Sequence, residues 1–381
     1  MSEETRAAGA ALTRRALLTG AGVAGVAAAG TFAVQRLAHT PAVGVDGASA
    51  VSAHGLHQAG IDRPELPQRH SLVAVLDVDR TRLQQTLKEV GVRIERLTAS
   101  PNGLPDVTPD GPGDLTVTVG LGSDALGATA HPELAALVDL PTFAGDDGIA
   151  EERRGGDVLL SIGSSDPSVL DAALAALLDV VDEPRVRWRE HGFRSAPVDG
   201  VARNTLGYHD GIVGPRGAEV DASVWISEGP LAGGSIAVLR RLRVDADAFR
   251  RLAPEARDAV IGREQSSGAP LSGGLRDDDI DLGAKAPDGR LMVPSDAHAR
   301  AAHPSFTGSG LMLRRSYGYL ADSDQGHLFV SFQNDIRTFV RTQLRLDETD
   351  ALMRFVTPSA SGAFAILPGA TAERPLGGTL F

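Results

Sequence analysis

The chain has 381 residues, with 49 acidic and 37 basic side chains and a formal net charge of −12 at neutral pH. This balance argues against nucleic-acid binding, which requires a basic face. The sequence contains no cysteine, so disulfides, iron–sulfur clusters and thiolate-ligated metals are excluded, and an ordinary hydrophobic core must supply the stability.

The first segment has the pattern of an export signal. Arg14 and Arg15 precede an uncharged run of mostly Ala, Gly and Val at 16–33. A membrane span needs roughly 20 strongly apolar residues, so a twin-arginine signal is favoured over the alternative, an N-terminal membrane anchor. Residues 1–53 are therefore expected to be the signal peptide and mature leader. The export machinery would be a partner, and the site of action extracellular, at the cell surface or periplasmic.

The region 54–198 has the pattern of an α+β domain. Apolar residues that alternate or run continuously predict strands at 71–78, 115–120, 157–163 and 185–189. Helical periodicity predicts helices at 80–92 and 168–181, with a short one at 132–138. The order strand, helix, strand, strand, helix, strand is that of a ferredoxin-like fold.

The region 199–381 repeats this pattern loosely. Strands are expected at 235–244, 311–315, 327–332 and 362–366, and helices at 245–261 and 336–346. A polar insertion at 262–304 interrupts the repeat, and long irregular segments of this kind tend to be functional or disordered. The predicted fold class is α+β, with two ferredoxin-like domains of the dimeric α+β barrel type and antiparallel sheets. We expect the halves to pack sheet to sheet around a cavity.

The insertion ends with two histidines, His298 and His303, and Arg314 follows shortly after. Histidine is the commonest protein ligand of haem iron and binds as neutral imidazole. The 16 residues from 298 to 314 (314 − 298) allow a turn and a return strand across a pocket, where the arginine could hold an anion. Taken alone, however, a lone loop histidine is more often a polar surface residue.

Residues 207–215 contain Asp-Gly and Gly-Pro, which on their own indicate turns. Together with later segments, they resemble the haem-dependent dye-decolorising peroxidases over most of the mature chain. The segments that carry the resemblance are His57-Gln-Ala-Gly-Ile61, Gly207-Tyr-His-Asp-Gly211, Gly233-Gly-Ser235, Ile261-Gly-Arg263, Gly268-Ala-Pro-Leu271, Asp296-Ala-His-Ala-Arg300, Leu313-Arg-Arg315 and Leu328-Phe-Val-Ser-Phe-Gln-Asn-Asp335. Each is weak alone, but in this order they are highly specific.

The resemblance implies one haem b per chain, held in a haem cavity with His298 as the proximal iron ligand. It makes Asp210 the distal acid and Arg314 the distal cation, and it places Gly211 at the cofactor. Asp335 is expected to accept the other N–H of His298, although the alternative of a helix N-cap before residue 336 is also open.

Two departures from the family pattern bear on these assignments. Gly214-Pro215 stands where the family usually has Asn-Pro, and Ala302-His303-Pro304 stands where it usually has Ala-Asn-Pro. His303 is therefore a rival to His298, which sits in the better-matching frame. Arg315 follows Arg314 on the expected strand and should point to the opposite face, which favours a structural role.

The implied reaction is reduction of hydrogen peroxide with oxidation of dyes, phenols or other organic electron donors. Alternatives are deferrochelatase-like release of iron from haem, and a haem-binding or haem-transfer protein without turnover. A homo-oligomer is possible. Members of the family are thought to pass electrons to the surface through Trp or Tyr, and for each candidate a place in the core is the competing interpretation: Trp188, Trp225, Tyr208, Tyr317 and Tyr319.

Overall fold

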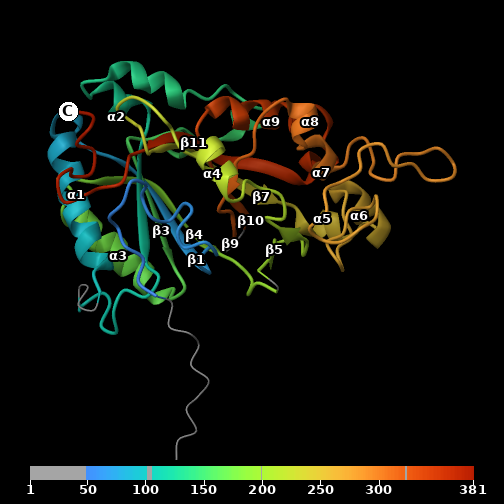
Figure 1. The fold of residues 1–381 in the computed structure, drawn as a ribbon, viewed down its shortest axis with the longest axis horizontal. Coiled ribbons are helices and arrows are strands. Elements are labelled where there is room, and N and C mark those ends of the chain that lie inside the picture. Colours follow the sequence, from blue (N-terminus) through green and yellow to red (C-terminus); the bar gives the residue numbers. More distant parts are fainter. Residues whose placement is uncertain (1–48, 101–104, 199, 322–323) are drawn as a thin grey trace, which may run out of the picture. The chain divides into compact units, whose positions relative to one another are not determined.

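The computed structural model describes residues 49–100, 105–198, 200–321 and 324–381 (Figure 1). The twin-arginine pair and the apolar run after it lie outside the described residues. Among the residues that are described, no helix is long and apolar enough to cross a membrane.

The N-terminal half has the predicted ferredoxin-like order. Its elements are β1 (His70–Asp77), α1 (Leu83–Thr98), β2 (Thr116–Leu121), α2 (Ser123–Gly127), β3 (Val158–Ser164), α3 (Ser168–Leu178) and β4 (Arg185–Phe193). The segment Pro132–Val138, expected as a short helix, forms 3-10 turns. The apolar positions that predicted α1, Leu83, Leu87 and Val90, are all buried against the sheet.

The C-terminal half repeats this order around a larger set of loops. Its elements are β5 (Ala202–Arg203), β6 (His209–Asp210), α4 (Ala218–Val224), β7 (Ser235–Val244), α5 (Ala246–Arg250), α6 (Pro254–Ile261), α7 (His298–Ala301), α8 (Pro304–Thr307), β8 (Leu313–Arg314), β9 (Tyr317–Ala321), β10 (Asp324–Gln333), α9 (Ile336–Thr349) and β11 (Val356–Ile366).

Two elements of this half differ from the sequence prediction. The helix expected at 245–261 is split into α5 and α6, because Pro254 lacks an amide hydrogen and begins a new helix. The strand expected at 311–315 is reduced to the two residues of β8, and β9 takes its place in the ferredoxin-like order. Both β8 and β9 pair antiparallel with β10 in one continuous register, and the amide of Arg315 between them donates to the carbonyl of Val330 at 2.9 Å.

The two halves share one closed barrel. The strand order is β7-β11-β2-β3-β1-β4-β9-β10, and β10 pairs back with β7, so the eight strands close on themselves. The seams between the halves are β11 with β2 and β4 with β9. Our expectation of two sheets packed face to face is therefore wrong, because the edges of each four-stranded sheet are hydrogen-bonded to the edges of the other.

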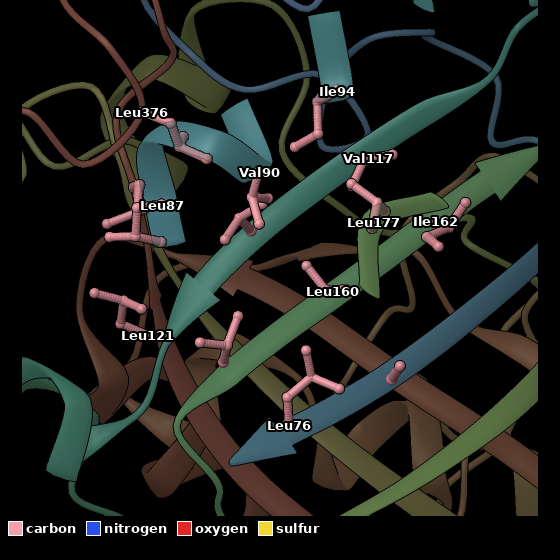
Figure 2. Close-up of a cluster of buried hydrophobic side chains, with 14 of the residues drawn as sticks. Leu76, Leu87, Val90, Ile94, Val117, Leu121, Leu160, Ile162, Leu177 and Leu376 are labelled. Carbon is pink, nitrogen blue, oxygen red and sulfur yellow. The ribbon is translucent and has the colours of Figure 1, made fainter. Parts of the chain in front are cut away.

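Alternate residues of the strands face opposite sides of the barrel wall. On β1, Leu72 and Leu76 pack outward with α1 and α3, and Figure 2 shows Leu76 in this cluster. Val73 and Val75 pack with residues inside the barrel. An eight-stranded barrel has room for side chains and little else. The interior is accordingly filled, among others by Trp188, and a ligand site must lie outside the barrel wall.

Helices cover the outer faces of the two half-barrels separately. Helices α1 and α3 lie side by side over the N-terminal strands, and α6, α7, α8 and α9 lie together beside the C-terminal strands (Figure 1). The space between this second helix group and the barrel wall is where the insertion 262–304 places its histidines.

Candidate active site

A cavity of about 280 Å³ lies between the outer face of β7 and β10 and the helices α7 and α9. All residues that line it fall between 204 and 358, in the C-terminal half. The expectation of a cavity between the two halves is therefore wrong, because the barrel has already joined their sheets. The walls are mostly apolar, with Leu242 and Val244 on β7, Phe329 on β10 and Leu346 on α9.

His298 is the first residue of α7 and lines this cavity. Its Nδ1 is 2.6 Å from Oδ2 of Asp350, a carboxylate with no exposed surface. The other oxygen of Asp350 accepts the amide hydrogen of Leu352 at 2.8 Å, which fixes the carboxylate. Burial alone would lower the pKa of His298, but the adjacent carboxylate outweighs it and raises that pKa. With Nδ1–H donated to Asp350, Nε2 is left as the acceptor, and it makes no hydrogen bond to any described residue.

The prediction that Asp335 is the partner of His298 is wrong. Asp335 caps the N-terminus of α9, where its Oδ1 accepts the amide of Arg337 at 2.9 Å and its carboxylate pairs with the Arg337 guanidinium. Asp350, which ends the same helix, holds the imidazole instead. The alternative assignment of Asp335 as a helix cap is confirmed.

His303 also lines the cavity, but both of its ring nitrogens are already engaged. Nε2 is 3.2 Å from Oδ2 of Asp279, and Nδ1 accepts the amide of Ser305 at 3.1 Å as the N-cap of α8. His298 is therefore better prepared than His303 to offer a nitrogen to a ligand in the cavity.

Asp210 is brought to the cavity by the hairpin of β5 and β6, in which Ala202 pairs with Asp210. The side chain of Asn204 accepts the amides of Leu206 and Tyr208 and closes the turn, at 3.0 and 3.1 Å. Gly207 adopts φ +84°, a left-handed conformation that strains other residues. This turn, at 204–207, precedes the Asp-Gly and Gly-Pro dipeptides that predicted one, which fall in or beside a run of bends at 211–214. The turn at 204–207 is the one that presents Asp210.

Arg314 lies on β8 with its Nη2 3.9 Å from Oδ1 of Asp210 and 3.2 Å from the carbonyl of Val213. Both charged side chains are 30% exposed and line the cavity that His298 lines. Burial alone would raise the pKa of Asp210, but the positive charge of Arg314, aided by His327 and Arg194, outweighs it and lowers the pKa.

The sequence also assigned roles to Gly211 and Arg315, the residues that follow Asp210 and Arg314 in the chain. Gly211 lines the cavity at φ +86°, and its backbone amide further favours the charged form of Asp210. Arg315 turns away from Arg314 and donates to the backbone carbonyls of Ile61, Pro64 and Glu65, which confirms the expected structural role.

All tryptophans and tyrosines of the chain are buried. Their exposed fractions are 6% or less: Trp188 6%, Trp225 5%, Tyr208 2%, Tyr317 5% and Tyr319 0%. The interpretation of each as a core residue is confirmed. Tyr208 lines the cavity and donates its hydroxyl hydrogen to Oδ1 of Asp258 at 2.6 Å.

These residues fit a haem group. An apolar-walled cavity suits the porphyrin, and His298 offers an Nε2 acceptor whose tautomer is fixed by a buried carboxylate, as is common for metal-bound histidines. Asp210 and Arg314 supply a proton acceptor and a fixed positive charge at the same cavity. Sequence reasoning missed Asp350 and His327, and local sequence carries no signal for either, because each acts through contacts far along the chain.

The fold and the site together define a protein of the dimeric α+β barrel type with a histidine and an Asp–Arg pair around one cavity. The chain belongs to the Dyp-type peroxidase family: the C-terminal family domain matches residues 201–371 and the N-terminal family domain matches residues 58–194. It is accordingly a haem b protein and an oxidoreductase that acts on peroxide.

Individual relatives agree with this assignment. The chain is 35% identical to a dye-decolorizing peroxidase of Thermobifida fusca (strain YX) over 70% of its own length and 67% of that protein. It is 31% identical to a deferrochelatase of Yersinia pestis over 83% of its length and 81% of that protein. Ferric DtpA from Streptomyces lividans superposes with a TM-score of 0.80 at 33% identity, covering 87% of this chain and 96% of that one.

Proposed function

We propose that this chain reduces hydrogen peroxide at haem b held by His298, and oxidises organic electron donors such as dyes or phenols. The observation that carries the proposal is the placement of His298, tied to Asp350, on the same cavity as the Asp210–Arg314 pair. A protein that only stored or transferred haem would have no need of that charged pair.

The residues divide the work by their chemistry. Bound haem supplies the electron transfer that peroxide reduction requires. Asp210, ionised because its pKa is lowered, accepts a proton from one oxygen of hydrogen peroxide and returns it to the other as water leaves. The guanidinium of Arg314 stabilises the anionic oxygen with its positive charge and its N–H donors. Asp350 holds His298 in the tautomer that offers Nε2.

The test of the ligand compares two histidines of the same cavity. His298→Ala should lose the haem or hold it weakly with an altered ferric spectrum, because Nε2 of His298 is the nitrogen not used by the protein. His303→Ala should keep a normal Soret band. Absorption spectra of the purified variants decide between them, and the reverse pattern would assign the ligand to His303.

Release of iron from haem is the second candidate, because relatives named deferrochelatase match 83% of the chain. That reaction needs two protons to replace the iron on the porphyrin nitrogens, and Asp210 is a proton-carrying group at the cavity. The porphyrin recovered after turnover separates the two functions: metal-free protoporphyrin indicates iron release, and intact haem indicates peroxidase chemistry alone.

The place of action is proposed from the sequence. Arg14 and Arg15 ahead of a weakly apolar run support twin-arginine export and therefore action outside the cytoplasm. The pathway transports proteins that have already folded, which suits a protein whose cofactor lies between helices and a closed barrel.

A further inference from the structure

A second, much smaller cavity lies behind Asp210. It measures about 10 Å³, close to the smallest volume that holds one water molecule. Four of its lining residues also line the main cavity and so form a partition between the two: Asn204, Asp210, Ser316 and His327. Arg194 and the seam between β4 and β9 close its other side.

Two polar groups of this partition lack partners among the described residues. The Oγ of Ser316 is buried and makes no hydrogen bond. It lies between β8 and β9 and lines both cavities. His327 uses Nε2 at 3.0 Å from the Thr205 hydroxyl, and its Nδ1 makes no hydrogen bond to a described residue. Buried hydroxyl groups nearly always have a hydrogen-bond partner, either in the protein or in an ordered water.

Peroxide reduction also creates a need for protons at this place. One hydrogen peroxide, two electrons and two protons give two waters. The electrons come from the organic donor, but the protons must enter from solvent and reach Asp210. Thr205 is half-buried, does not line the main cavity and is hydrogen-bonded to His327, so these two side chains offer a route that does not pass through the main cavity.

We propose that Ser316, His327 and Asp210 bind one water molecule in the small cavity, and that His327 passes protons between this water and the Thr205 hydroxyl. A neutral imidazole can accept a proton at one nitrogen while it releases another from the second. His327 and Ser316 are then positioning residues for Asp210. The inference rests on the proposed role of Asp210 as proton acceptor.

The charges around His327 and Asp210 are consistent with this role. Burial lowers the pKa of His327, and the charge of His298 lowers it slightly further. The charge of Asp210 raises this pKa, but by less than burial lowers it, so the imidazole is neutral at neutral pH. Asp210 is faced by Arg314, His327 and Arg194, which together lower its pKa. It is therefore a carboxylate that can take the protons that His327 delivers.

The first test locates the water. A crystal structure of the haem-loaded protein should show an ordered water within hydrogen-bonding distance of Ser316 Oγ, His327 Nδ1 and Asp210. Ser316→Val, which removes the hydroxyl and fills the space, should lack it. A Ser316 hydroxyl bonded directly to protein, with no water beside Asp210, would overturn the proposal.

The second test separates proton supply from the first reaction with peroxide. His327→Gln and Thr205→Val should lower kcat at neutral pH by about tenfold, below the range of direct general acid–base catalysis, with a larger solvent isotope effect. The initial peroxide reaction, followed by stopped flow, should keep its parent rate. Thr205→Ser retains the hydroxyl and should restore kcat, and His191→Gln at an exposed histidine of β4 should change nothing.

The pH profile gives a readout that loss of structure would not produce. In acid, where His327 is protonated, its positive charge helps to lower the pKa of Asp210, so His327→Gln should move the acid limb of the peroxide reaction to higher pH. If His327→Gln leaves both kcat and the acid limb unchanged while Asp210→Asn slows the peroxide reaction, the relay is refuted and the proposed function stands. If Asp210→Asn itself reacts at the parent rate, the proposed role of Asp210 fails as well.

Discussion

The choice between two carboxylates at opposite ends of one helix shows what a single residue contributes to this site. Asp335 and Asp350 flank α9, and both cap a helical turn with one oxygen. The other oxygen of Asp335 accepts a hydrogen bond from the Arg337 guanidinium at the surface. The other oxygen of Asp350, whose side chain is fully buried, is hydrogen-bonded to His298. Of the two carboxylates, the buried one alone can set the tautomer and basicity of His298, the proposed ligand.

We predict that Asp350→Asn weakens haem affinity or activity by roughly 10–100-fold, the usual effect of removing the partner of a metal-bound histidine. Asp335→Asn is the matched control, because asparagine caps a helix about as well as aspartate. It should leave the ferric spectrum and haem affinity unchanged. Haem titration with both variants measures the difference, and equal loss in the two would contradict the assignment of Asp350.

The Asp210–Arg314 pair predicts a specific pH dependence. The pKa of Asp210 lies below its ordinary value, so its base function is complete at neutral pH and is lost as pH falls through that lowered pKa. Arg314→Leu removes the main cause of the lowering, so the acid limb should move to higher pH. The rate should also fall by roughly 100 to 1,000-fold at every pH, the cost of losing one charge-stabilising donor.

Asp210→Asn should instead flatten the acid limb, because no titrating base remains, and slow the reaction with peroxide by roughly 100 to 10,000-fold. Stopped-flow mixing of both variants with peroxide across acidic to neutral pH provides the measurement. Parent rates in both variants would show that neither residue takes part in the reaction.

The sequence was sufficient for residues that sit in recognisable segments and insufficient for their partners. His298, Asp210 and Arg314 each lie in a motif of the family, and the cavity brings all three together. Asp350 is 52 residues from His298, and it reaches the imidazole because α9 ends beside α7. Such a contact depends on how helices pack, which no local pattern encodes.

At the level of elements, periodicity located most of the strands, but it overestimated β8 and did not predict β9. Leu311–Arg315 has the composition of a strand, yet only Leu313 and Arg314 pair with β10 as β8. The longer pairing along the same edge of β10 is made by β9. Arg314 faces the cavity while Arg315 faces the core, because successive residues of one ladder point to opposite faces. The alternation along this edge of β10 is thus what positions Arg314.

The seam between β4 and β9 depends on small residues. A Cβ added to Gly192 would lie 2.6 Å from the Cβ of Tyr317. Gly192→Val should therefore destabilise the protein by about 1–3 kcal/mol, the usual cost of overpacking. Gly127→Ala, where nothing lies within 4 Å of the new Cβ, should be neutral or stabilising by up to about 1 kcal/mol. Denaturant unfolding of both variants measures the free energies of unfolding. A Gly192→Val variant as stable as the parent protein would show that this seam is not tightly packed.

At the level of the whole molecule, the predicted pair of ferredoxin-like domains of the dimeric α+β barrel type is confirmed, but the sequence did not show that the two sheets join edge to edge. Each half alone would expose the edges of β2 and β4, or of β11 and β9, which are paired across the seams. Pairing of edges from opposite halves is a long-range property of the folded chain. It also determines where the cofactor cavity can be, because closure fills the interior and leaves the outer face of the C-terminal strands.

A protein of this architecture must complete its barrel before its cavity exists, which bears on the proposed export route. Twin-arginine signals are read by a receptor as an address, and lysine lacks the planar guanidinium that distinguishes arginine. We predict that Arg14→Lys together with Arg15→Lys leaves the folded, haem-loaded precursor inside the cell. The matched control replaces Arg250 and Arg251, an exposed arginine pair at the end of α5, and should be exported normally. Immunoblots of cell and exported fractions measure the outcome, and undiminished export of the Arg14, Arg15 variant would show that this segment is not a twin-arginine signal.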